Sequence, residues 1–206
     1  MGLRFVGPRV GTYRTILMDP PWPKAQGGGR IRRGADRHYR LMRLRDIMAL
    51  PVRDLADPAG CHLWMWAIGN QLDDAIDALR AYGARLINCR PWVKADPVGE
   101  TWRPQRIGIG QYLGSDAEFL LFGRFGPPMP YRTHQGRRIR PRQTLYGPRT
   151  RTHSQKPAQS RPDIELVSPG PYIELFARDP QPGWDCWGEA VQHCSSVQLV
   201  SEPEST

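Results

Sequence analysis

The sequence lacks any apolar run near the roughly 20 residues that a helix needs to cross a bilayer. Its first 14 residues mix arginine with glycine and contain no apolar segment typical of a secretory signal. Only four cysteines occur, and none forms a C-x-x-C pair or has a histidine at the spacing of a zinc site. We therefore expect a cytoplasmic protein with free thiols, no membrane contact and no metal site.

Acidic residues are also scarce relative to basic ones. The chain has 20 Asp and Glu against 29 Lys and Arg, which gives a formal net charge of +9. A field of that sign attracts phosphates, so nucleic acid is the first partner to consider. The length of 206 residues fits one compact domain, and 21 glycines and 21 prolines predict long loops.

Short apolar runs and helical spacings alternate along the chain. Apolar runs predict strands at residues 15–18, 61–68, 85–93, 118–122 and 172–177. Helical spacing predicts a helix over 44–55 that is broken by Pro51, and further helices over 72–79 and 162–167. This order is typical of an α/β fold with a mostly parallel sheet, helices on both faces and ligands at the carboxyl ends of the strands.

Two stretches rich in arginine have no such periodicity. We interpret residues 23–38 and 126–152 as long basic substrate loops within a single domain of residues 1–196. Residues 197–206 are expected to form a flexible tail. The oligomeric state and any recognition sequence stay open at this level.

The segment Asp19-Pro20-Pro21-Trp22 directly follows the first predicted strand. Its residues together suit the alkylation of an adenine amine. The exocyclic amine of adenine is a poor nucleophile, because its lone pair is delocalised into the ring. A carboxylate beside a rigid main-chain carbonyl can accept its N–H groups and take up the developing positive charge. The indole offers a face on which a flipped base can stack. The alternative is a strand-to-turn corner with a buried tryptophan.

The sequence resembles the DPPW-class N6-adenine methyltransferases of the beta type. These include bacterial and phage DNA-adenine enzymes and the catalytic subunit of the eukaryotic messenger-RNA adenosine methyltransferase. The likeness covers roughly residues 13–191 and looks closest to the short prokaryotic or phage members. The blocks that carry it, in the order of the family, are Asp19-Pro20-Pro21-Trp22, Ala35-Asp36-Arg37-His38-Tyr39, Leu63-Trp64-Met65-Trp66, Trp92-Val93-Lys94, Ser154-Gln155-Lys156-Pro157, Ser168-Pro169-Gly170-Pro171, Glu174-Leu175-Phe176-Ala177-Arg178 and Gly183-Trp184-Asp185-Cys186-Trp187-Gly188.

The resemblance implies a Rossmann-like methyltransferase sheet, S-adenosylmethionine as methyl donor, and direct in-line transfer to the N6 amine of adenine in DNA. RNA as the substrate remains an alternative, as does a catalytically silent partner subunit that only binds nucleic acid. An intact Asp-Pro-Pro-Trp motif argues against the silent subunit.

Residue roles follow from the same resemblance. The catalytic group would be Asp19, Pro20, Pro21 and Trp22. The cofactor would be held by Asp19, Lys156, Glu174, Phe176, Arg178 and Glu189. Substrate contacts are expected from Arg37, His38 and Tyr39 in the first basic loop and from Arg137, Arg138 and Arg140 in the second.

The chain departs from the family at two places. Glu189 stands where relatives commonly have asparagine after Trp-Gly, and a carboxylate accepts hydrogen bonds from ribose hydroxyls but cannot donate them. The stretch from Met1 to Arg14 contains no Asp or Glu, whereas the eukaryotic enzymes use an acidic residue there to hold the adenine of the cofactor. Recognition of that adenine must therefore rely on other groups.

Overall fold

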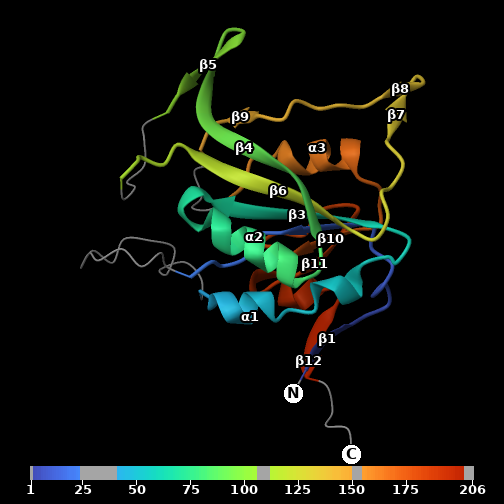
Figure 1. Cartoon of the computed structure of the whole chain (residues 1–206). Coiled ribbons are helices and arrows are strands. Elements are labelled where there is room, and N and C mark those ends of the chain that lie inside the picture. Colours follow the sequence, from blue (N-terminus) through green and yellow to red (C-terminus); the bar gives the residue numbers. More distant parts are fainter. Residues whose placement is uncertain (1, 24–40, 106–111, 150–154, 202–206) are drawn as a thin grey trace, which may run out of the picture.

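The computed structural model describes residues 2–23, 41–105, 112–149 and 155–201. Its centre is an eight-stranded sheet, with α1 and α2 on one face and α3 on the other (Figure 1). The expected α/β fold with helices on both faces is confirmed.

One half of the sheet is parallel. The strands β11 (Trp184–Trp187), β10 (Tyr172–Leu175), β2 (Thr15–Met18) and β3 (Cys61–Ile68) lie side by side in that order and run in one direction. All four residues of β2 are buried, as expected for a strand covered on both faces. Parallel strands bring their carboxyl ends to one edge of the sheet, and this edge positions the candidate site.

The other half contains the antiparallel pairs, so the sheet is mixed. The strand β6 (Ala117–Phe125) lies between β3 and β4 (Arg85–Val98) and runs antiparallel to both. β4 turns back into β5 (Thr101–Pro104), and β9 (Leu145–Gly147) joins β4 in parallel. No helix separates β4, β5 and β6 in the described residues, and strands joined without a helical crossover return antiparallel.

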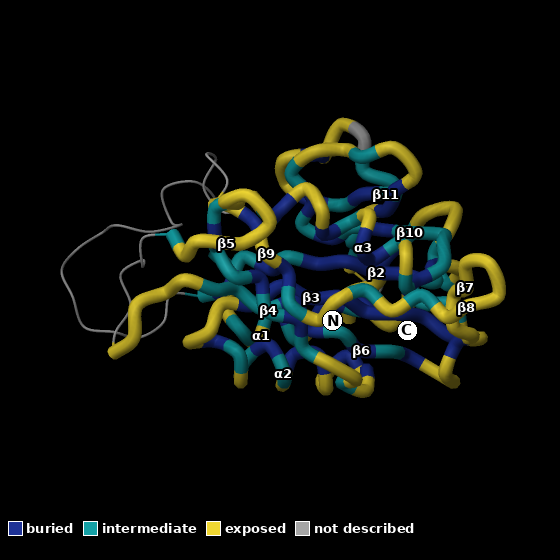
Figure 2. Tube along the Cα trace, turned by 90° about the horizontal axis from the view of Figure 1, so that it is seen from above, coloured by how far each residue is buried: buried dark blue, intermediate teal, exposed yellow. Residues whose placement is uncertain are grey.

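The helices cover the two faces unequally. On one face lie α1 (Leu44–Met48), the 3₁₀ turns η2 (Val52–Leu55) and η3 (Gly69–Gln71), and α2 (Leu72–Ala81). Pro51 separates α1 from η2, which confirms the expected break. On the other face, α3 (Ser160–Val167) packs its buried Ile164 in a cluster with Trp64, Trp66 and Trp92. Figure 2 shows the buried strands between these layers.

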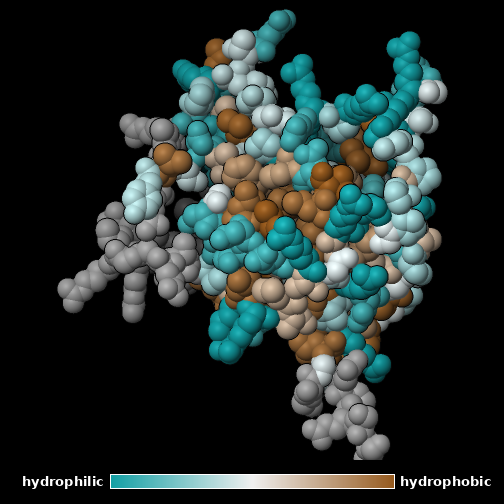
Figure 3. All heavy atoms as spheres, in the orientation of Figure 1, coloured by the Kyte–Doolittle hydropathy of each residue, from teal (hydrophilic) through white to brown (hydrophobic). Residues whose placement is uncertain are grey.

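Part of the antiparallel half has no helix over it. Exposed apolar side chains gather over β4 and β6, above α2, in the centre of the face in Figure 3. Ile87 on β4 is 46% exposed there. α2 packs against β3, β4 and β6 but leaves this part of the face uncovered.

The carboxyl-terminal segment differs from the flexible tail expected from residue 197. Residues Gln198–Ser201 form β12, which pairs antiparallel with β1 (Leu3–Val6). The apolar side chain that fixes this ribbon is Phe5, whose ring packs edge-on against Trp187 with 5.4 Å between centroids. The short 3₁₀ helix η4 (Glu189–Cys194) connects β11 to the ribbon.

The second basic stretch also contains regular structure that the sequence analysis did not predict. Thr133–His134 (β7) and Arg137–Arg138 (β8) form a hairpin. Its two turn residues, Gln135 and Gly136, have φ of 49° and 74°, and positive φ at both positions suits the right-handed twist of the paired strands. Only the amino-terminal edge of the first basic loop, Pro23, lies within the described residues.

Candidate active site

Three charged side chains from separate parts of the chain meet at the carboxyl edge of the parallel strands. Asp19 directly follows β2, Glu118 is the second residue of β6, and Lys156 precedes α3. Lys156 Nζ lies 3.0 Å from Asp19 Oδ1 and 3.0 Å from Glu118 Oε2. One ammonium therefore bridges two carboxylates at the strand ends.

The bridge extends at both ends into a longer line of charges. Lys94 Nζ, from β4, lies 2.7 Å from Glu118 Oε1, and Arg178 Nη2 lies 3.6 Å from Asp19 Oδ2. We call Lys94, Glu118, Lys156, Asp19 and Arg178 the charged row. Its signs alternate, so each carboxylate faces two cations and Lys156 faces two carboxylates. Such pairing offsets much of the cost of burying charge.

Burial and charge shift the pKa values within the row in different directions. Burial raises the pKa of Asp19 above its ordinary value, and the nearby Lys156 and Arg178 offset only part of this rise. Burial alone would lower the pKa of Lys156, but Asp19 and Glu118 together raise it. Burial would raise the pKa of Glu118, yet Lys156 and Lys94 hold it below its usual range. The pKa of Asp19 is thus shifted upward and the pKa of Glu118 downward.

Neither Glu118 nor Lys94 is among the site residues predicted from the sequence. Lys94 lies in one of the family blocks, and Glu118 begins a predicted strand. An acidic residue inside an otherwise apolar strand was a usable signal, because carboxylates are rarely buried without a partner.

The Asp-Pro-Pro-Trp segment is fixed by several hydrogen bonds. The Trp22 main-chain N–H donates to the carbonyl of Pro20 at 2.8 Å, and the Met42 N–H donates to the carbonyl of Pro21 at 2.9 Å. The Trp22 indole N–H donates to the carbonyl of Trp66, at the end of β3, at 2.9 Å. The prolines and these bonds hold Asp19 at a constant place beyond its strand.

Trp22 itself differs from the open stacking face expected from the sequence. Its side chain is only 8% exposed and belongs to the core on the α1 and α2 side. An indole whose N–H donates to a main-chain carbonyl and whose rings are buried holds the segment after β2 against β3. The structure therefore supports the alternative in which Trp22 is a buried residue at the turn after the strand.

A cavity of about 330 Å³ opens beside Asp19. It is lined by five of the six residues expected to hold the cofactor, namely Asp19, Lys156, Glu174, Phe176 and Arg178. The sixth, Glu189, is exposed at the start of η4 and is not among the lining residues. The structure thus brings together the residues after β2 and β10 but leaves Glu189 apart.

Glu174 has a partner in the cavity that the sequence analysis did not identify. Arg161, in the first turn of α3, places Nη2 at 2.6 Å and Nε at 2.7 Å from Glu174 Oε2. Burial raises the pKa of Glu174, and Arg161 offsets part of that rise. The guanidinium fixes the carboxylate at the cavity wall and leaves its other oxygen as an acceptor.

The chain after β10 follows a strained path. Phe176 has φ of 61°, a conformation that costs a non-glycine residue about 1–3 kcal/mol and often occurs at functional sites. The Ala177 N–H donates to the carbonyl of Trp187 at 3.0 Å, and the Phe176 ring packs edge-on against Trp187 with 5.3 Å between centroids. A Cβ at Gly188 would lie 2.5 Å from the carbonyl oxygen of Ala177, so only glycine fits there. These contacts hold the path on which Arg178 reaches Asp19.

The expected substrate residues are not gathered at this edge. Arg37, His38 and Tyr39 lie outside the described residues. Arg137, Arg138 and Arg140 are exposed in and beside the hairpin β7–β8.

That hairpin is anchored at the opposite end of the parallel strands from Asp19. Arg132 Nη1 donates to the carbonyl of Glu165 near the end of α3 at 2.6 Å, and to the hydroxyl of Tyr172 at 3.3 Å. Tyr172 is the first residue of β10, and Figures 1 and 2 place the hairpin at the far end of the sheet from β5. The structure therefore separates Arg137, Arg138 and Arg140 from the charged row.

Other features expected from the sequence can be checked only in part. Cys61 and Cys89 are free thiols, and the side chain of Cys194 is not described. Across the described residues, no cluster of three or more His, Cys, Asp or Glu could hold a metal ion. None of the helices in this part of the chain is long and apolar enough to cross a membrane.

The similarity of this chain to known proteins extends over all residues of this site. Residues 13–190 match the model of the MT-A70 family. The chain is 30% identical over 211 residues to the type II methyltransferase M.MunI of Mycoplasma sp, with 93% of this chain and 83% of that protein aligned. It is 26% identical over 202 residues to the human N(6)-adenine-specific methyltransferase METTL4, which covers 94% of this chain and 40% of the human protein. The chain thus spans most of the bacterial relative and less than half of the human one.

Proposed function

Because the chain belongs to the MT-A70 family, we propose that it transfers a methyl group from S-adenosylmethionine to the N6 amine of adenine in DNA. The observation that carries this proposal is Asp19, a partly buried carboxylate held at a strand end beside a charged cavity. Both relatives described above are named as methyltransferases, and the human one is named for N6 of adenine. A DNA substrate in a bacterial or phage setting would place the protein in the cytoplasm.

The cavity residues fit S-adenosylmethionine by their chemistry. Its volume of about 330 Å³ lies in the range of small-molecule sites. Asp19 and Glu174 are suited to the ammonium, sulfonium and hydroxyl groups of this cofactor, and Lys156 and Arg178 to its carboxylate. When bound, the cofactor supplies an electrophilic methyl group.

Asp19 would act on the amine of the target base. One carboxylate oxygen accepts an N–H of adenine, which directs the nitrogen lone pair toward the methyl group. The amine nitrogen would take the methyl group that the cofactor supplies, and the proton that the amine then loses would pass to Asp19 and on to water. Its raised pKa makes Asp19 a better acceptor than an ordinary aspartate.

The rest of the charged row keeps Asp19 in place during this step. Lys156 contacts Oδ1 and Arg178 lies near Oδ2, so rotation of the carboxylate would break both ion pairs. The Pro20 carbonyl already accepts the Trp22 N–H, and its second lone pair can accept the other N–H of the amine. A fixed acceptor needs no reorganisation when charge develops.

The direct test is methyl transfer by the purified protein. Labelled S-adenosylmethionine and duplex DNA are incubated with it, the DNA is digested, and the nucleosides are separated by chromatography and identified by mass spectrometry. We expect label in N6-methyladenine, and sequencing of DNA from a methylation-free host that expresses the chain should show methylation at defined sites. RNA of the same sequence is tested in parallel, and label in the RNA but not in the DNA would favour the RNA alternative. Cofactor binding without transfer to either would favour a silent partner subunit.

A further inference from the structure

A second hollow lies at the base of the projecting hairpin formed by β4 and β5. Its volume is about 460 Å³, and it is lined by Asp96, Arg103, Pro104, Gln105 and Arg149. Arg149 belongs to the second basic loop, and the other four residues were assigned no role above. Two guanidinium groups face one carboxylate here, so the hollow carries net positive charge.

The hollow continues the charged row along β4. Lys94 and Asp96 are two residues apart on this strand, so their side chains lie on the same face, about 7 Å apart along it. Lys94 contacts Glu118, which contacts Lys156 beside Asp19. The hollow therefore begins one strand repeat beyond Lys94, at the end of the charged row away from Arg178.

Hydrogen bonds fix the floor of the hollow in advance. Gln105 Nε2 donates to Asp96 Oδ1 at 2.6 Å, and the main-chain N–H of Gln105 donates to the carbonyl of Lys94 at 3.0 Å. Gln105 Oε1 accepts the main-chain N–H of Arg149 at 2.8 Å, while Arg149 Nη2 donates to the carbonyl of Ser115 at 2.9 Å. The carboxylate of Asp96 is thereby engaged by an amide, and among the described residues the Arg149 guanidinium donates only to Ser115.

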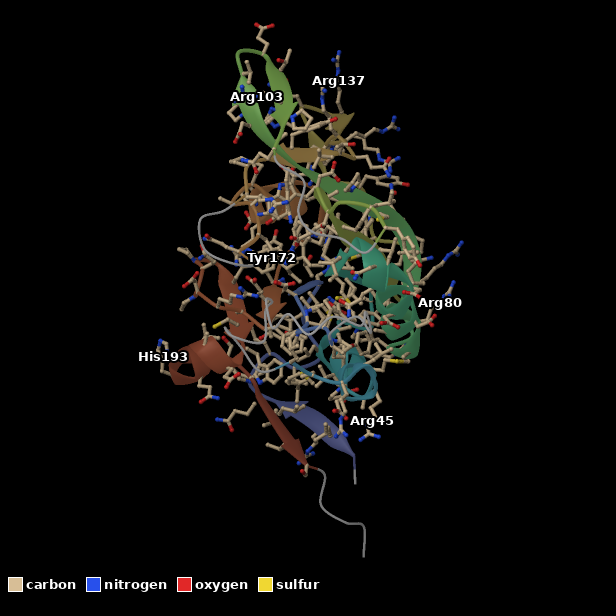
Figure 4. The ribbon with its side chains drawn as sticks, turned by 90° about the vertical axis from the view of Figure 1, so that its left-hand side faces the viewer. Arg45, Arg80, Arg103, Arg137, Tyr172 and His193 are labelled. Carbon is tan, nitrogen blue, oxygen red and sulfur yellow. The ribbon has the colours of Figure 1, made fainter. Side chains whose placement is uncertain are left out.

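Arg103 is the other cation of the hollow. It is exposed on β5, and in the described part of the chain it makes no ion pair or side-chain hydrogen bond. Figure 4 shows it at the projecting hairpin, far from Arg80 and Arg45. The neighbouring Trp102 stacks on Tyr146 of β9, with 5.7 Å between centroids and 17° between planes. This stack stiffens the hairpin that carries Arg103.

We propose that this hollow binds a backbone phosphate of the DNA strand that carries the target adenine, on the β4 side of the flipped nucleotide. The inference rests on the proposed function for the position of the target base. Guanidinium groups match phosphate oxygens with paired N–H donors, and phosphate contacts fix the register of a strand without reading its sequence. A base drawn out of the stack toward Asp19 needs its flanking backbone held.

The test compares two double variants that each lose two positive charges. Arg103→Ala with Arg149→Ala removes the cations of the hollow. Arg80→Ala with Arg85→Ala is the matched control, because both residues are exposed at the opposite end of β4. Fluorescence anisotropy with a labelled duplex is measured over a series of salt concentrations, together with calorimetric affinity for S-adenosylmethionine and KM for DNA.

We expect the hollow variant to lose about tenfold or more in DNA affinity at low salt and to flatten the log–log salt slope by about 0.9 for each lost phosphate contact. Its cofactor affinity should stay unchanged, and its KM for DNA should rise more than its kcat falls. The single variant Arg103→Ala removes no contact of the described fold and should show part of this effect. Arg103→Lys should restore some affinity, because it keeps the charge but not the paired donors.

Equal affinity and equal salt slope in the hollow variant and the control would overturn the inference. If the wild type methylates adenine and this equality holds, only the phosphate site is wrong. If the hollow variant loses DNA binding while the wild type transfers no methyl group, the phosphate site stands and the proposed function fails.

Discussion

Lys156 Nζ lies 3.0 Å from Asp19 Oδ1, although the two residues are far apart in the sequence. The same ammonium contacts Glu118, so it links the carboxylate after β2 to the second residue of β6. The group proposed to act on adenine is therefore oriented by a cation that is itself oriented by a second carboxylate. Four predictions follow from this arrangement and from the cavity beside it.

Asp19→Asn should abolish methyl transfer while leaving the fold intact. The amide keeps the size of the side chain but loses the charge that accepts the amine proton, and loss of such a group costs about 100-fold or more in rate. Single-turnover transfer measures the effect, with thermal unfolding as the control for folding. A variant that keeps more than about a tenth of the wild-type rate would contradict the role of Asp19.

The acid limb of the pH–rate profile should report Asp19, since only the ionised carboxylate accepts a proton. Burial raises its pKa, so the limb should lie above pH 3.8, the ordinary value for aspartate. Lys156 lowers this pKa, and Lys156→Met should therefore move the limb to higher pH. Glu118 raises it, and Glu118→Gln should move the limb to lower pH. Shifts of kcat profiles in the same direction in both variants would contradict the charged row as the cause.

Trp22→Phe should destabilise the protein, because it removes the N–H that donates to the carbonyl of Trp66. An unpaired buried carbonyl costs about 1–3 kcal/mol. Trp22→Ala also leaves a cavity and should cost about 3–5 kcal/mol. Urea unfolding gives the stabilities, and methyl transfer should fall in the same order. Activity that is kept in the Phe variant and lost in the Ala variant, at equal stability of the two, would instead favour a stacking role.

Glu174 and Glu189 should differ in their effect on the cofactor. Glu174 lines the cavity and is held by Arg161, so Glu174→Gln should weaken binding of S-adenosylmethionine by about tenfold, the loss of one charge-assisted hydrogen bond of about 1.5 kcal/mol. Glu189 is exposed and outside the lining residues, so Glu189→Gln should leave the affinity nearly unchanged. Calorimetry of both variants decides this. A strong loss at Glu189 alone would restore the role expected from the sequence.

Local patterns in the sequence determined much of the fold and one end of the site. The apolar run of residues 15–18 stops at two prolines, which cannot continue a strand ladder, so Asp19 had to stand at a strand end. Apolar continuity likewise predicted β3 and β10, and Pro51 predicted the break after α1. These features depend on neighbouring residues, which is why the sequence alone was sufficient.

Only the tertiary structure decided which charges meet. Nothing in the sequence around Glu118, Lys94 or Arg161 indicates their partners, because each partner lies on another element and the pairing depends on strand order. The same holds for Trp22, whose burial depends on β3 lying beside β2. The arginines of the hairpin β7–β8 and those of the β4–β5 hollow look alike as residue types. The sheet places one group at the amino end of its parallel strands and the other beside the carboxyl edge, because strand direction, and not composition, sets the edge at which a loop emerges.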